Sequence, residues 1–157
     1  MNLFDRARYL LSTRGPALTF RLHRVVYRAS GGRLLPTSGR MPVLLLTTTG
    51  RKTGLERTWP LSYFMDEDRY VLVASNRGRD DHPGWYLNLT AHPEAVAQIG
   101  SERVPVVAEV ASASDRARLW EEAMRLEPLY AAYQRGTQRL IPVVLLRPHR
   151  EVWASPL

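Results

Sequence analysis

Three strand patterns follow one another between residues 43 and 74, and only turns separate them. They cover residues 43–48, 58–65 and 70–74, and the acidic run 66–68 forms the turn between the last two. Strands joined by such short connections pair antiparallel, because a parallel pair needs a long crossover. The central part of the chain therefore predicts an antiparallel sheet and argues against an alternation of strands and helices.

The strand pattern at 58–65 adds a constraint of its own. Its alternation predicts that Trp59, Leu61 and Tyr63 face one way and that Phe64 faces the other. Pro60 has no backbone N–H to give to a neighbouring strand, so it predicts an edge position or a bulge.

The remaining patterns add short strands and a few helices. We expect strands at 96–99, 104–110 and 141–146, and helices at 85–91 and from 114 through 124, with an interruption at Pro128. This order predicts the fold class α+β, mainly β: a small antiparallel barrel with helices at its ends. The 157 residues predict a single domain over 1–157, in which residues 1–36 form an N-terminal helical extension.

The N-terminal extension is basic and amphipathic. One face of its second helical piece carries Leu18, Leu22, Val25, Val26 and Ala29, and another face carries Arg21, Arg24 and Arg28. The net charge of +7 is concentrated in this half of the chain, where only two acids precede residue 58. An anionic partner is indicated, and the helix either packs on the domain with its arginines in water or rests on an anionic membrane. The expected location is the cytoplasm, with contact at the inner membrane face left open.

Two glycines bracket a tight, basic connection between the first two strands. Between Gly50 and Gly54 stand Arg51, Lys52 and Thr53, and Lys52 is the only lysine of the chain. Turn amides together with a guanidinium and an ammonium group form a donor set suited to phosphate. An ordinary charged hairpin turn is the alternative, and a P-loop is excluded because no helical pattern follows the second glycine.

A polar loop over residues 75–84 leads into an aromatic helix. Trp85 and Tyr86 could wall a flat heterocycle beside Asn88, or Trp85 and Leu89 could simply pack in the core. His82 is read as a loop residue, since the histidines lack ligand spacing, and no metal site is expected. The chain has no cysteine, which excludes thiolate chemistry. No nucleic-acid-binding module is recognised, so no nucleic-acid partner is expected.

Seven segments, in order, resemble the deazaflavin-dependent nitroreductase family. They are Leu-Thr-Thr-Thr-Gly-Arg-Lys-Thr-Gly-Leu-Glu-Arg (46–57), Pro-Leu (60–61), Arg-Tyr-Val-Leu-Val-Ala-Ser (69–75), His-Pro-Gly-Trp-Tyr-Leu-Asn-Leu (82–89), Ala-His-Pro-Glu-Ala (91–95), Tyr-x-x-Tyr-Gln (130–134) and Arg-Leu-Ile-Pro-Val-Val-x-Leu (139–146). The resemblance implies a split β-barrel that binds coenzyme F-420, a deazaflavin with a phosphate-linked oligoglutamate tail. Family members transfer hydride to quinones, nitro compounds or similar acceptors.

The resemblance also implies roles for particular residues. The cofactor-binding set comprises Thr48, Thr49, Arg51, Lys52, Thr53, Gly54, Arg57, Ser75, Asn76, Arg77, Trp85, Tyr86 and Asn88. Within it the residues from 51 to 57 would hold the phosphate, and the residues from 75 onward would surround the ring. Ser75, Tyr130 and Tyr133 would face the acceptor as catalytic residues.

One departure from the family pattern concerns the loop that would lie against the ring. The family often has small residues after Ser75-Asn76, whereas this chain has Arg77 and Arg79, which could grip the cofactor tail or narrow the acceptor pocket. Two other functions remain open: a non-catalytic protein that binds the cofactor or a membrane, and a relative that binds flavin mononucleotide or haem. Oligomeric state and the physiological acceptor are not encoded in any motif.

Overall fold

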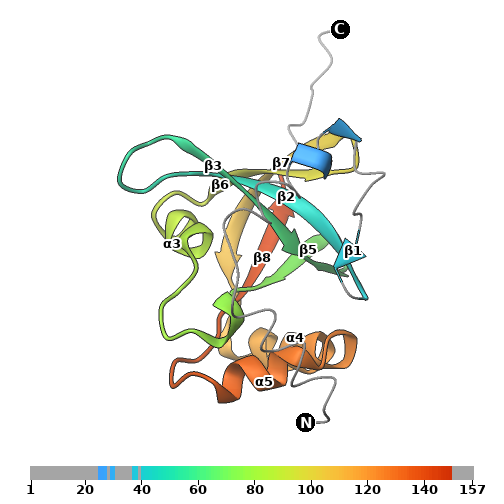
Figure 1. Ribbon diagram of the computed structural model, residues 1–157, viewed down its shortest axis with the longest axis vertical. Helices are drawn as coiled ribbons and strands as arrows, with labels where there is room; N and C mark the ends of the chain where they lie inside the picture. Colours follow the sequence, from blue (N-terminus) through green and yellow to red (C-terminus); the bar gives the residue numbers. More distant parts are fainter. Residues whose placement is uncertain (1–24, 28, 31–36, 39, 150–157) are drawn as a thin grey trace, which may run out of the picture.

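The computed structural model describes residues 25–27, 29–30, 37–38 and 40–149, which form a curled antiparallel sheet with helices around it (Figure 1). The strands are β1 (Thr37–Ser38), β2 (Met41–Thr49), β3 (Glu56–Ser62), β4 (Phe64–Asp66), β5 (Arg69–Val73), β6 (Glu94–Ile99), β7 (Glu102–Val110) and β8 (Val143–Pro148). The helical elements are η1 (Asn76–Gly78), α3 (Gly84–Ala91), α4 (Ala113–Leu126) and α5 (Leu129–Arg135).

One bent segment closes the sheet. The strands lie in the order β1-β2-β6-β7-β8-β5-β4, every pairing is antiparallel, and β3 pairs with β2. The strands β3 and β4 are consecutive and interrupted only at Tyr63. Because β3 pairs with β2 and β4 pairs with β5, the segment β3–β4 links the two sides of the strand order. The backbone N–H of Tyr63 donates to the carbonyl of Pro42 over 3.0 Å at the bend. The predicted mainly-β antiparallel barrel is therefore confirmed.

The predictions for the strand pattern at 58–65 are confirmed as well. Pro60, in β3, lies opposite Leu45 of β2. In the described chain β3 pairs with β2 alone, so Pro60 occupies an edge strand, the position where a residue without an N–H is tolerated. Trp59, Leu61 and Tyr63 share one apolar cluster, whereas Phe64 belongs to another.

Two apolar clusters hold the helices to the sheet. The first contains the inward residues of β2, β5, β6, β7 and β8 together with Trp85 and Leu89 of α3, so α3 is anchored on the barrel interior. The second lies between the opposite face of β5 and β8 and the helices α4 and α5, where Leu119 and Ala123 are buried one helical turn apart. Figure 1 shows α4 and α5 at one end of the sheet and α3 on the side of the β2–β3 hairpin.

Most of the predicted N-terminal extension, including residues 1–24 and 31–36, lies outside the described residues. Residues 25–27 and 29 are described as helical, and the buried side chain among them is Tyr27, whose hydroxyl donates to the carbonyl of Val43 and accepts from the N–H of Gly100. Val25 and Ala29, which belong to the predicted apolar face, are exposed. The aromatic ring of Tyr27 and its two hydrogen bonds instead contact β2, and the choice between packing on the domain and resting on a membrane stays a prediction.

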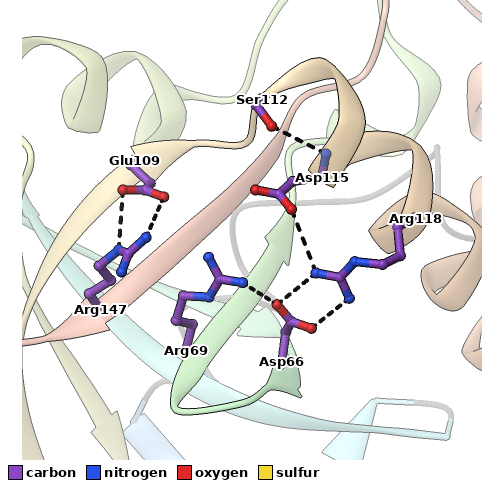
Figure 2. A network of polar contacts seen from close by, with 7 residues as sticks. All are labelled: Asp66, Arg69, Glu109, Ser112, Asp115, Arg118 and Arg147. Carbon is purple, nitrogen blue, oxygen red and sulfur yellow. Dashed lines mark hydrogen bonds and ion pairs between the residues drawn. The ribbon is translucent and has the colours of Figure 1, made fainter.

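A carboxylate fastens the β4–β5 hairpin to α4 (Figure 2). Asp66 accepts two hydrogen bonds from Arg118, at 2.7 and 3.0 Å, and a third from Arg69. The side chains of Asp66 and Arg69 are each 12% exposed, whereas that of Arg118 is 56% exposed. The hydrogen bond from Arg118, helped by that from Arg69, holds the pKa of Asp66 below its ordinary value of 3.8 against a burial that raises it.

We expect Asp66→Asn to lower the free energy of unfolding by about 2 kcal/mol, because Arg69 is left buried beside a neutral amide. In the wild type the Asp66 carboxylate stabilises the fold fully when the pH lies above the ordinary pKa of 3.8. This stabilisation disappears as the pH falls from 3.8 through the lowered pKa of the folded protein. Urea denaturation between pH 3 and pH 7 measures both effects. Glu122→Gln, which breaks the exposed pair with Arg125, is the control and should change little.

Candidate functional site

The β2–β3 connection is a closed six-residue loop from Gly50 to Leu55. The N–H of Gly50 donates to the carbonyl of Leu55 over 2.8 Å, and the N–H of Gly54 donates to the carbonyl of Gly50 over 2.7 Å. A Cβ atom on Gly50 would lie 2.9 Å from the Leu55 oxygen, and Gly54 has a φ of +68°. Both glycines are therefore required by the geometry of the loop.

This loop presents its donors to solvent. The side chains of Arg51, Lys52, Thr53 and Arg57 are all exposed, and Glu56 is the one acid among residues 50–57. Within the described part of the chain, no hydrogen bond engages the backbone N–H groups of Lys52 and Thr53. The predicted phosphate donors are thus brought together on one accessible turn.

Asn88 joins this turn to α3. Its side-chain carbonyl accepts from the backbone N–H of Arg51 over 3.2 Å and from the guanidinium of Arg51 over 3.4 Å. Its amide donates to the hydroxyl of Thr48 over 3.0 Å, and both Asn88 and Thr48 are almost fully buried. Asn88 was predicted as part of the ring wall, and in this structure its amide contacts the hairpin. Thr49, half-buried at the end of β2, precedes the same turn.

The aromatic residues of α3 differ in exposure. Trp85 is 4% exposed and packs in the barrel cluster, as the core alternative for this residue predicts. Tyr86 is half-buried, and its ring lies 4.8 Å from the ring of His82 and edge-on to that of Trp85. Tyr86 is therefore the accessible aromatic residue of the pair and links α3 to the preceding polar loop.

The polar loop begins with an unusual left-handed turn. Asn76, Arg77 and Gly78 have φ values of 45°, 57° and 77°, a conformation that costs a non-glycine residue about 1–2 kcal/mol. Ser75 accepts from the N–H of Arg77 through its hydroxyl over 3.4 Å, and the amide of Asn76 donates to the carbonyl of Asp81 over 2.9 Å. Strain of this kind persists where the surroundings enforce it, which is common at functional sites.

Of the two predicted catalytic tyrosines, Tyr133 lies against this loop. The backbone of Tyr133 contacts Gly78, where an added Cβ would come within 2.9 Å of the Tyr133 oxygen. Tyr130 and Tyr133 are each 7% exposed, with rings 6.2 Å apart, and Tyr130 also lies 6.3 Å from Trp120. Burial raises the pKa of Tyr130 far above its ordinary value. In this structure Tyr130 is a core residue, whereas Tyr133 lies next to the ring loop.

We expect Gly78→Ala to destabilise the protein by about 3 kcal/mol, since a methyl group would meet the Tyr133 backbone in a left-handed conformation. Gly54→Ala is the matched control: its φ is also positive, but nothing lies within 4 Å of the added atom, so the cost should be about 1 kcal/mol. Guanidinium denaturation of both variants compares the two. Equal losses would show that the contact with Tyr133 is unimportant.

Two residues that hold the loop were not singled out from the sequence. Arg139 and Thr137, between α5 and β8, bond to the polar loop: Thr137 donates to the carboxylate of Asp80 over 2.8 Å, and Arg139 contacts four groups described below. In the sequence, Arg139 is only the first residue of a segment that resembles the family. An arginine just before a buried strand could have indicated a structural role, but its partners are more than fifty residues away in the chain.

A surface cavity of about 450 Å³ lies between β4 and α4. None of the predicted site residues lines it, and its charged groups include the Asp66–Arg118 and Glu122–Arg125 pairs. Among the described residues, no group of three or more acidic or histidine side chains could hold a metal ion. No described helix has both the length and the apolar character of a membrane span.

The fold and these contacts define a split-barrel protein with an exposed basic hairpin, tied to α3, and a strained polar loop. Residues 19–148 match the family described as F420H(2)-dependent quinone reductase. A Mycobacterium tuberculosis protein named F420H(2)-dependent quinone reductase is 42% identical over 132 residues, which span 80% of this chain and 87% of that protein. A second M. tuberculosis relative is 43% identical over 108 residues, or 69% of this chain and 91% of its own length.

Solved structures agree with these relatives. A structure described as an F420-H2 dependent reductase is 38% identical, with a TM-score of 0.62 over 68% of this chain and 94% of that one. Another, described as a domain-swapped dimer, is 32% identical, with a TM-score of 0.65 over 81% and 94%. This chain belongs to the F420H(2)-dependent quinone reductase family, which confirms the predicted resemblance to deazaflavin-dependent reductases, their split β-barrel and their cofactor, coenzyme F-420.

The residues present fit that cofactor. Its phosphate and carboxylates need a cationic, solvent-accessible donor set, and the hairpin supplies three cations and two unengaged N–H groups in the described chain. Near α3, the buried indole N–H of Trp59 also has no hydrogen-bond partner among the described residues, and the ring of Trp59 lies against Gly84. An unpaired buried donor beside α3 suits a polar atom of a bound molecule.

Proposed function

We propose that this protein reduces a quinone with reduced coenzyme F-420, holding the cofactor's phosphate arm at the β2–β3 hairpin and its ring beside the loop at Ser75. The cofactor supplies the two electrons as a hydride when bound. The chain supplies position and charge: it holds the ring and the acceptor in contact and stabilises the negative charge that develops on the acceptor oxygen.

The observation that carries this proposal is the double attachment of α3. Asn88 bonds to the hairpin, and Tyr86, half a turn earlier, stacks on the loop through His82. The eight residues of α3 span only about 12 Å. A phosphate site and a ring site fixed to one short helix suit an elongated cofactor with a flat ring at one end and an anionic arm further along.

At the hairpin, the guanidinium groups of Arg51 and Arg57 and the ammonium group of Lys52 would bind the phosphate. The hydroxyl of Thr53 and the adjoining backbone N–H groups would add neutral donors, and Gly54 permits the turn. Thr48 and Thr49 would act from the end of β2, Thr48 through its bond to Asn88.

At the loop, Ser75 and Asn76 would lie against the ring, with Tyr86 on the wall nearby. Arg77, in the left-handed turn, would face the anionic part of the cofactor, and buried Trp85 would support α3 from below. Ser75, with Tyr133 beneath the loop, would donate a hydrogen bond to the acceptor oxygen. Tyr130 would support Tyr133 through its ring rather than touch the acceptor.

The test is a reaction of the purified protein with reduced coenzyme F-420 and a water-soluble naphthoquinone, followed by the return of oxidised deazaflavin absorbance. The proposal expects quinone-dependent oxidation, and a nitroaromatic acceptor run in parallel measures selectivity. Cofactor binding without oxidation by any quinone would instead identify a non-catalytic binder. A coloured preparation with flavin or haem spectra would identify a different cofactor.

We expect Ser75→Ala to lower kcat for the quinone about tenfold, the effect of losing one neutral hydrogen bond in the transition state. The dissociation constant for the cofactor should stay within about twofold, because the hairpin is untouched. Single-turnover kinetics together with a binding titration separate the two quantities. Loss of affinity at full kcat would assign Ser75 to cofactor binding alone.

A further inference from the structure

In the connection between α5 and β8, one guanidinium group makes more contacts to the polar loop than Thr137, which bonds there to Asp80 alone. Arg139 donates through Nη2 to the carbonyls of Ala74 and Ser75, at 3.1 and 2.8 Å, and through Nε to the carbonyl of Arg79, at 2.9 Å. Its Nη1 lies 3.2 Å from Nδ1 of His82. The four contacts span both ends of the loop, so one side chain joins its beginning to its end.

The contact with His82 fixes the state of the imidazole. A guanidinium group has donors and no acceptor, so Nδ1 must offer its lone pair, and the proton of the neutral ring resides on Nε2. Protonation of Nδ1 would remove this hydrogen bond and place two cations in contact. Burial and the charge of Arg139 lower the pKa of His82, and the carboxylate of Asp81 opposes them. The ring of Tyr86 faces His82 from α3.

The loop needs such a restraint. Its turn has left-handed backbone at Asn76 and Arg77, which a free loop would leave for ordinary conformations. Arg139 is tied in turn to α5, because its carbonyl accepts from the amide of Gln134 over 2.8 Å, and Gln134 accepts from the N–H of Ile141 over 3.0 Å. The restraint therefore transmits the position of α5 and β8 to the loop.

We propose that Arg139 is a positioning residue that holds the Ser75–His82 loop in its cofactor-binding conformation while His82 is neutral, and that protonation of His82 releases the loop. The inference rests on the proposed function for the role of Ser75 and Asn76, whereas the restraint itself concerns this chain alone. It implies that the affinity for coenzyme F-420 falls with acidification as His82 becomes charged.

The first experiment uses the cofactor-free protein. Hydrogen–deuterium exchange should show faster exchange in residues 75–82 of Arg139→Gln, by about tenfold or more, with the 50–55 hairpin unchanged. Nitrogen NMR of the histidine rings should show His82 with its proton on Nε2, and its pKa should rise in the variant. Arg135→Gln, an exposed arginine in the last turn of α5, removes the same charge and should leave both readouts unchanged.

The second experiment titrates coenzyme F-420 between pH 5 and pH 8. The affinity of wild type for the cofactor should fall as the pH drops below 6.5, the ordinary pKa of histidine, towards the lowered pKa of His82. His82→Asn, whose amide oxygen accepts from Arg139 at any pH, should abolish this dependence. Arg139→Gln should bind about tenfold more weakly, and Arg139→Lys, with fewer donors, should rescue only part of the loss.

The outcomes separate this inference from the function on which it rests. If wild type fails to bind the cofactor, the proposed function is wrong, and the exchange and NMR data on the free protein still decide the restraint. If Arg139→Gln keeps the wild-type exchange pattern and the titration of His82, Arg139 does not position the loop. If His82→Asn retains the wild-type pH dependence, protonation of His82 does not release the loop.

Discussion

Replacing Arg51, Lys52 and Arg57 together with alanine will weaken the binding of coenzyme F-420 by on the order of a thousandfold. A charge-assisted hydrogen bond contributes about 1.5 kcal/mol at the lower end of its range, which applies to an exposed site, so three of them correspond to about three powers of ten in Kd. All three side chains are exposed. The Arg51 guanidinium is bonded to the buried carbonyl of Asn88, but that carbonyl keeps the backbone N–H of Arg51 in the variant, so the fold should be largely unaffected. Fluorescence titration of the oxidised cofactor measures Kd, and thermal unfolding checks the fold.

A charge-matched control accompanies this variant. Replacing Arg40, Arg103 and Arg135 with alanine also removes three exposed arginines, but none belongs to the hairpin. If net charge alone attracted the anionic cofactor, both triple variants would lose affinity equally. The Kd of the control variant for coenzyme F-420 should remain within a fewfold of the wild-type Kd at physiological salt, because charges more than about 8 Å away are screened there.

Replacing Asn88 with leucine will detach the hairpin from α3. The substitution removes three hydrogen bonds, leaves the N–H of Arg51 without a partner, and leaves the buried hydroxyl of Thr48 with only its long bond to the Arg57 carbonyl. We expect the free energy of unfolding to fall by about 4 kcal/mol. The amide of Arg51 should exchange with deuterium much faster, and cofactor affinity should fall although no charge has changed.

Two further variants sharpen the Asn88 experiment. Asn88→Asp keeps the shape and the acceptors for Arg51, so the hairpin should stay attached, while the added negative charge should weaken phosphate binding. Thr90→Ala alters an exposed residue of the same helix and should leave stability within about 0.5 kcal/mol of wild type. A full-affinity Asn88→Leu variant would mean that the hairpin does not need α3.

The elements of the barrel were predictable because their signals are local. The strand at 41–49 is apolar, its turn has two glycines, and Pro60 has no N–H, so each feature is legible without knowledge of distant residues. The start of α4 was predicted at residue 114, and the helix begins at Ala113, where Ser112 accepts from the N–H of Asp115 over 3.2 Å. Closure through the bend at Tyr63 was not predicted, because it depends on which strands meet.

The candidate site was predictable in composition and less so in geometry. The hairpin residues lie together because they are consecutive. Asn88 was selected from the sequence, but its partner Thr48 is forty residues away, and only the fold reveals that contact. Arg139 is further still from Ser75, and its role arises from tertiary contact alone. The family resemblance implied that Tyr130 faces the acceptor, whereas in this structure Tyr130 is buried and lies near Trp120.

The most direct test of the hairpin clamp compares two ligands with two proteins. Wild type and the Arg51/Lys52/Arg57 triple alanine variant are each titrated with coenzyme F-420 and with its deazaflavin core lacking the phosphate, lactate and glutamates. The account predicts that wild type strongly prefers the complete cofactor and that the variant binds both ligands equally weakly. An undiminished preference in the variant, or equal losses for both ligands, would show that the anionic arm is held elsewhere.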